Sequence, residues 1–208
     1  MGSGVGVVLQ AVFTFCSYAL LAVFTQNAVL GRAFGVSRLV KLVGDDAMDS
    51  LTFCVLLCAV QLISAPLAFF VNRLWLAEYA NKDFVRPLVL VACSVAAFLL
   101  VLILVAALFR APRAKRITAV LPMASFNCCI IGTLLITTVQ GFTLGQTLGF
   151  ALGSGLGYSG VVFIVTEGER KLENDAVPET FRGLPIVLLY LAVLSMAAYG
   201  MIGHTLSY

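Results

Sequence analysis

Residues 121–132 read LPMASFNCCIIG and lie inside a long apolar run. Asn127 is costly inside a membrane unless its amide is hydrogen-bonded, because lipid offers no partners. Pro122 lies before it, and two thiols, Cys128 and Cys129, follow it directly. The pattern predicts a helix that is interrupted at membrane depth, where it lines a cavity or a bound group. An unbroken membrane helix, with the thiols as small packing residues, is the alternative.

The composition is that of an integral membrane protein. The 208 residues are 61% hydrophobic and 11% charged, and the mean hydropathy is +1.05. Soluble domains are typically about 45–50% apolar and about 25% charged. The net charge of +3 is small and argues against a nucleic-acid partner. We expect a single membrane domain over residues 1–208, with the lipid bilayer around it.

Six apolar runs are long enough to cross a membrane as helices of about 20 residues. Because an open strand leaves its backbone unpaired in lipid, the predicted fold is all-α with six transmembrane helices. These spans are placed at residues 5–30, 48–71, 86–109, 117–139, 144–166 and 184–203.

Basic residues predict the orientation of these spans. The first, third and fifth loops hold ten Lys and Arg residues, and the second and fourth hold three. The positive-inside rule therefore places the odd-numbered loops in the cytoplasm and both termini outside.

The first span repeats the unusual feature of the fourth. Asn27 lies deep in the first apolar run, 100 residues before Asn127. Three spans separate the two positions, so the halves 1–110 and 111–208 would face opposite ways. The pattern predicts an inverted repeat of three plus three helices, with half-helices in spans one and four and a site between the halves. Chance placement of two asparagines is the alternative.

All six cysteines fall in apolar runs and none in a loop, which is not the pattern of a secreted disulfide framework. Packing or metal ligation remain as their roles. Cys54 and Cys58 lie one helical turn apart with no His or carboxylate nearby, which favours packing. The six are Cys16, Cys54, Cys58, Cys93, Cys128 and Cys129.

Three stretches resemble a known family. They are QNAVLGRAFGVSR at 26–38, LPMASFNCCIIG at 121–132, and ERKLENDAVPETFRGLPIVLLYLAVLSMAAYGM at 169–201. The chain resembles the integral-membrane subunits of the Rnf and Na⁺-pumping NADH:quinone oxidoreductase (Nqr) complexes, and among these the A-type Rnf and E-type Nqr subunits. The most specific part is the motif of the fifth loop, with Pro178, Phe181, Arg182 and Gly183.

The resemblance implies a function in the bacterial cytoplasmic (inner) membrane. Two homologous, oppositely oriented subunits would share a [2Fe–2S] cluster, with two cysteines from each. The cluster would relay electrons between flavins and iron–sulfur centres on other subunits, and export of Na⁺ or H⁺ would be coupled to that flow. Cys128 matches a cysteine of the family motif and is the metal ligand that we expect.

The first half departs from the family. The family places a cysteine between its first asparagine and the Gly-Val-Ser segment, whereas residues 27–37 contain none. Cys129 is a weak alternate ligand, since adjacent cysteines are awkward on one iron. Two other functions are therefore open: a transporter-like protein without a cluster, and a scaffold for other subunits. No nucleophile–base pair or nucleotide motif is evident, so we expect no catalytic residue in this chain, which would be one part of a redox-driven translocase.

Overall fold

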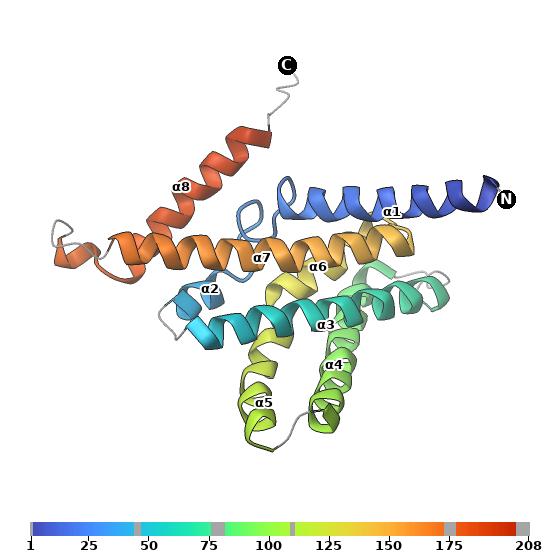
Figure 1. Cartoon of the computed structure of the whole chain (residues 1–208), viewed down its shortest axis with the longest axis horizontal. Coiled ribbons are helices and arrows are strands. Elements are labelled where there is room, and N and C mark those ends of the chain that lie inside the picture. Colours follow the sequence, from blue (N-terminus) through green and yellow to red (C-terminus); the bar gives the residue numbers. More distant parts are fainter. Residues whose placement is uncertain (1, 44–46, 76–81, 109–110, 173–177, 203–208) are drawn as a thin grey trace.

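The computed structural model describes residues 2–43, 47–75, 82–108, 111–172 and 178–202, and these contain helices and no strand. Figure 1 shows how the helices are arranged. They are α1 (Gly2–Val23), α2 (Val36–Val43), α3 (Ala47–Leu74), α4 (Lys82–Leu108), α5 (Ala111–Ser125), α6 (Cys128–Val139), α7 (Leu144–Leu172), the short 3₁₀ helix η2 (Glu179–Phe181) and α8 (Leu184–Ile202).

The described helices contain four or five candidate membrane spans. The four single spans lie in α1, α3, α4 and α7, and the pair α5 and α6 adds a fifth if this bent pair is one span. The sixth predicted span falls on Leu184–Gly200, an apolar segment at the short end of what crosses a bilayer. The all-α membrane class is thus confirmed, whereas the count of six and the inverted orientation of the halves stay predictions.

The order of the helices is similar in the two halves of the chain. A broken helical segment comes first in each half, α1 with α2 and then α5 with α6, and two further helices follow it. The first helix ends at Val23, earlier than the predicted span of 5–30. Residue 1 and residues 203–208 lie outside the described part, so the outward placement of the termini is not tested.

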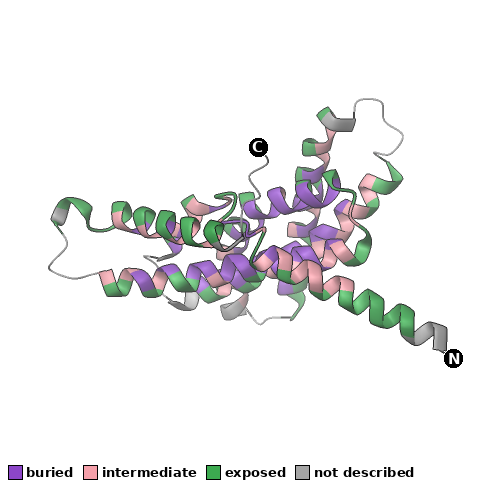
Figure 2. Ribbon diagram, turned by 90° about the horizontal axis from the view of Figure 1, so that it is seen from above, coloured by how far each residue is buried: buried purple, intermediate pink, exposed green. Residues whose placement is uncertain are grey.

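Helix α7 lies at the centre of the packing. It contacts α1 on one side and α3 on the other, and the three run side by side in Figure 1. Helices α4 and α5 pack against each other and against α3. Buried residues follow the middle of the assembly, while the N-terminal part of α1 is exposed along its length (Figure 2). In a membrane, such an exposed apolar helix faces lipid or another subunit.

Small residues on α7 allow α1 to approach closely. A side chain at Gly149 would overlap the carbonyl oxygen of Phe15, and one at Gly153 would overlap that of Ala19. Helices in lipid associate largely through van der Waals packing, which such close backbone contact strengthens. Gly149 and Gly153, which lie four residues apart, therefore have a packing role at this interface.

We expect Gly153→Ala to destabilise the protein, because the new methyl group meets the backbone of α1, which cannot rotate away. Overpacking of this kind costs about 1–3 kcal/mol. Gly160→Ala is the matched control in the same helix, since nothing lies within 4 Å of its added Cβ. Thermal unfolding of the purified protein in detergent should give a lower Tm for Gly153→Ala only, and equal Tm values for the two variants would refute the packing role.

Candidate functional site

The break after α1 is organised by the side chain of Asn27. Its Nδ2 donates to the carbonyl oxygen of Val23 at 2.8 Å, at the end of the helix. Its Oδ1 accepts from the N–H groups of Val29 at 3.0 Å and Leu30 at 3.1 Å. These bonds satisfy backbone groups that a helix end leaves unpaired, so the chain can leave the helix without exposing them to an apolar surrounding.

The chain then turns sharply into α2. The backbone is left-handed at Ala33, with φ of 55°, and at Gly35, with φ of 74°. The N–H of Phe34 donates to the carbonyl oxygen of Ala28 at 2.9 Å, which closes the turn. Residue 35 suits glycine because an L side chain is strained at this φ. The first break is therefore a compact and hydrogen-bonded loop between α1 and α2.

The second break separates α5 from α6, which are bent by 49° relative to each other. Asn127 is the N-cap of α6, with extended backbone angles, and its Oδ1 accepts from the N–H of Cys129 at 2.9 Å. An asparagine in this position is among the best helix caps. Its Nδ2 is buried and has no hydrogen-bond partner.

The two breaks are in contact. A Cβ on Gly35 would lie 2.5 Å from Oδ1 of Asn127, so the turn of the first break lies against the cap of the second. One residue earlier, the ring of Phe34 fills the space beside Gly132 of α6. Both residues of this turn thus pack on the start of α6.

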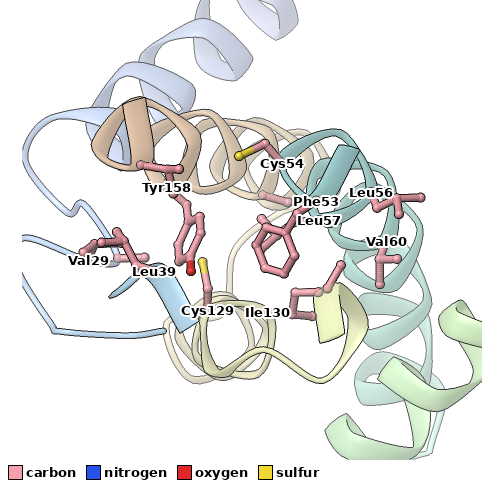
Figure 3. Close-up of a cluster of buried hydrophobic side chains, with 14 of the residues drawn as sticks. Val29, Leu39, Phe53, Cys54, Leu56, Leu57, Val60, Cys129, Ile130 and Tyr158 are labelled. Atoms are coloured by element: carbon pink, nitrogen blue, oxygen red, sulfur yellow. The ribbon is translucent and has the colours of Figure 1, made fainter. Parts of the chain in front are cut away.

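Tyr158 of α7 joins the breaks to the central helix. Its hydroxyl donates to the carbonyl oxygen of Gly35 at 3.1 Å, and the side chain is fully buried. Figure 3 shows it between Leu39 of α2 and Cys129 of α6, with the ring of Phe53 facing it. The two ring centroids are 6.1 Å apart. The first break, the second break and α7 thus form one packed unit.

Arg38 brings a positive charge to the edge of this unit. Its guanidinium carbon lies 5.7 Å from the centroid of the Phe53 ring. The guanidinium also contacts the sulfur of Met123 on α5. A cation over an aromatic face is attracted by the ring quadrupole. Arg38 of α2 therefore contacts both α3 and α5.

The two thiols of the second break differ in exposure. Cys128 is exposed, and Cys129 is fully buried with its Sγ 3.6 Å from Oγ of Ser154. Cys129 thus faces the protein interior, whereas Cys128 faces outward and could reach a group held by another chain.

The described breaks hold one exposed thiol, Cys128. Residues 24–35 of the first break hold no cysteine, and Cys16 lies within α1. In the described part of the chain, no three His, Cys, Asp or Glu residues come together to hold a metal ion. The described breaks therefore offer one outward thiol, whereas the resemblance of the sequence implies two.

A buried polar network lies beside the second break, and our sequence reasoning missed it. Nε2 of Gln61 donates to Oγ1 of Thr133 at 2.7 Å, and this hydroxyl lies 2.8 Å from Oγ of Ser154. Oγ1 of Thr133 also donates to the carbonyl oxygen of Cys129. Oε1 of Gln61 has no partner. An amide inside the second apolar run is the signal that would have found this network.

The loop motif lies apart from the breaks, at the start of α8. Pro178, Phe181, Arg182 and Gly183 are all exposed, and Gly183 has φ of 80°. The N–H of Phe181 donates to the carbonyl oxygen of Pro178 at 2.9 Å. Further along α8, the hydroxyl of Ser195 donates to the carbonyl oxygen of Leu30 in the first break.

Comparisons with known proteins identify related membrane subunits. The chain is 25% identical to the A-type subunit of the Na⁺-translocating ferredoxin:NAD⁺ oxidoreductase complex of Acetobacterium woodii over 192 residues, which cover 89% of this chain and 95% of that one. It is 31% identical to the A-type subunit of the ion-translocating oxidoreductase complex of Aromatoleum aromaticum over 83 residues, or 40% of this chain and 43% of the relative. The E-type subunit of the Na⁺-translocating NADH-quinone reductase of Hahella chejuensis is 30% identical over 86 residues, with 41% and 42% covered.

The alignments with the Aromatoleum and Hahella proteins thus take in less than half the length of each relative. The family model described as "Rnf-Nqr subunit, membrane protein" matches residues 15–205. Because that match leaves out only the two ends, the chain belongs to the Rnf-Nqr family of membrane subunits.

Proposed function

We propose that this chain is a membrane subunit of an Rnf- or Nqr-type complex, in which it helps electrons to cross the membrane while Na⁺ or H⁺ is exported. The names of its relatives, which are subunits of ion-translocating oxidoreductases, support this. Reactions of NADH, ferredoxin or quinone belong to other subunits, which carry flavins and iron–sulfur centres. This chain contributes a path through the membrane, in the bacterial cytoplasmic membrane.

One observation carries the proposal: two helix breaks meet inside an apolar bundle, and an exposed thiol begins the helix that follows one of them. Gly35 of the first break lies against Asn127 of the second, and Cys128 follows Asn127 at the surface. Interrupted helices are tolerated at membrane depth where they line a cavity or a bound group. Because Cys128 faces outward, such a group would lie between this chain and a neighbour.

The neighbour that we propose is a homologous subunit in the opposite orientation. Its own breaks would face Cys128 across the interface. The exposed apolar helices offer the surface for such a contact, and lipid covers the remainder. The strongly exposed residues of α1 include Val7, Val8, Leu9 and Phe13.

A [2Fe–2S] cluster shared with this neighbour would receive Cys128 as its one thiolate from the described breaks. Thiolates are the ligands that such clusters prefer, and the cluster would supply one-electron transfer. The remaining ligands would have to come from the partner. Cys129 is the weaker ligand, because its thiol is enclosed by the protein and contacts Ser154. The part played by this chain is to hold Cys128 at the capped start of α6.

A second function has support in the missing cysteine of the first break. In this case the chain keeps the family fold without a cluster and acts as a transporter-like or scaffolding subunit. The network of Gln61, Thr133 and Ser154 places neutral oxygens inside the bundle, where a cation could be bound without a carboxylate. Ion flux in vesicles without an electron donor would support it, and strict dependence on a donor would exclude the transporter form.

For the redox function we expect Cys128→Ser to lower donor-driven electron transfer in the purified complex by at least about tenfold, because a cluster ligand is lost. The iron content and the visible absorption of the complex should fall with it. Cys16→Ser is the matched control, since Cys16 is also exposed but lies within α1. Cys129→Ser should keep both signals. If the complex contained no iron and the Cys128→Ser variant transferred electrons normally, this thiol would have no redox role.

We expect Asn127→Ala to destabilise the start of α6 by about 1 kcal/mol, because the N–H of Cys129 loses its acceptor. Asn127→Ser should keep most of the stability, since serine also caps helices well. Thermal unfolding in detergent measures the difference, and electron transfer in the complex should follow the same order. If the alanine and serine variants were equally stable, the cap would not hold the break.

A further inference from the structure

A second polar region lies at the other end of α6 from Asn127. There a cavity of about 550 Å³ opens where α3 ends, α4 begins and α6 turns into α7. Arg73 and Arg86 both line it. Among the described residues around the cavity none is acidic, and the polar ones are Asn72 and several threonines. The cavity therefore has the charge and the hydrogen-bonding groups that suit an anion.

Thr147 gives the cavity a buried group that lacks a partner. Its side chain lines the cavity, is only 2% exposed, and its Oγ1 makes no hydrogen bond. A buried hydroxyl without a partner costs free energy, so its presence asks for an explanation. The N–H of Thr147 donates to the carbonyl oxygen of Thr143. The hydroxyl makes no hydrogen bond and is therefore available to a ligand.

The start of α7 adds a favourable field. The 29-residue helix begins at Leu144, beside the cavity, and the N-terminal end of a helix attracts negative charge. Thr143 and Gln146 cap this end, with the N–H of Thr143 donating to Oε1 of Gln146 at 2.9 Å. The helix end is thus held in place, and Thr147 lies within its first turn.

We infer that this cavity binds a phosphate-bearing anion, and that the anion is the headgroup of an acidic phospholipid. Two arginines, the hydroxyl of Thr147 and the start of α7 supply the phosphate contacts. A lipid is favoured over free phosphate because the neighbouring apolar side chains are exposed. Phe70 is 50% exposed, Leu74 73% and Trp75 74%. Tryptophan in such a place is typical of the membrane interface.

The distribution of charge along the chain agrees with this inference. The second and fourth loops face outward according to the positive-inside rule, and that side holds three Lys and Arg residues. Two of the three, Arg73 and Arg86, line the cavity. Two of the three basic residues on this sparsely charged side thus lie at one site.

Trp75 offers a direct test, since it is the one tryptophan of the chain and follows the cavity end of α3. The purified full chain is reconstituted in phosphatidylcholine vesicles that contain brominated phosphatidylglycerol or, for comparison, brominated phosphatidylcholine. Bromine on the acyl chains quenches tryptophan at short range. We expect the acidic lipid to quench at several-fold lower mole fraction than the neutral one.

Three variants separate a built site from general attraction to charge. Thr147→Val keeps the shape of the side chain and removes only the unpartnered hydroxyl, so an empty cavity would lose nothing. We expect this variant and Arg73→Gln each to weaken the lipid preference by about fivefold. Lys171→Gln is the control, because it removes one positive charge at the opposite end of α7. It should leave the preference unchanged.

The outcomes are distinct. If inorganic phosphate protects the protein against thermal unfolding in detergent, and protects Thr147→Val less, the phosphate site is supported. If the same protein shows no lipid preference, the ligand is a soluble anion and not a lipid. An equal loss in Lys171→Gln, or no loss in Thr147→Val, would overturn the site in favour of surface attraction. No effect of either lipid or phosphate would also overturn it. None of these results bears on Cys128, so the proposed redox function is tested separately.

Discussion

The need to pair every backbone polar group in an apolar surrounding controls this structure. A helix can stop inside a membrane only if other groups replace the hydrogen bonds that its end loses. Asn27 makes one donor and two acceptor bonds to the chain around it, and Asn127 accepts from the N–H of Cys129. The two side chains therefore make the breaks tolerable, and the breaks place Cys128 at the surface.

Close packing around α7 is the second requirement, and it follows from the first. The first break folds back on the second only because Gly35 has no side chain between its backbone and Asn127. Gly149 and Gly153 likewise have no side chains, so α1 can approach α7 closely. Because lipid and apolar side chains are chemically alike, the close fit of the helices and the buried hydrogen bonds contribute much of the association. Tyr158 of α7 donates a hydrogen bond to the carbonyl oxygen of Gly35, so it links the first break to the packing around α7.

Hydropathy and isolated polar residues predict the all-helical membrane class, whereas the six-span inverted repeat stays a prediction. They located the apolar helices to within a few residues at most ends, and they singled out Asn27 and Asn127. The early end of α1 at Val23 was not predicted, because Phe24 and the residues after Asn27 remain apolar and hydropathy does not record backbone direction. The contact between Phe34 and Gly132 depends on tertiary packing over a long sequence separation. No local pattern contains that information.

Gln61 and Thr147 were missed for a related reason. Each is a single polar residue in an apolar or small-residue stretch, and its significance depends on what faces it from another helix. Nε2 of Gln61 donates to Thr133 across the bundle, whereas Oγ1 of Thr147 makes no hydrogen bond and lines a cavity with two arginines. The contrast is informative, because a paired buried group stabilises the fold, whereas an unpaired one has a cost that only a ligand or water repays. The neutral network beside the breaks and the cationic cavity at the far end of α6 thus serve different chemistry. The second break holds an exposed thiol, and the cavity is lined by two arginines.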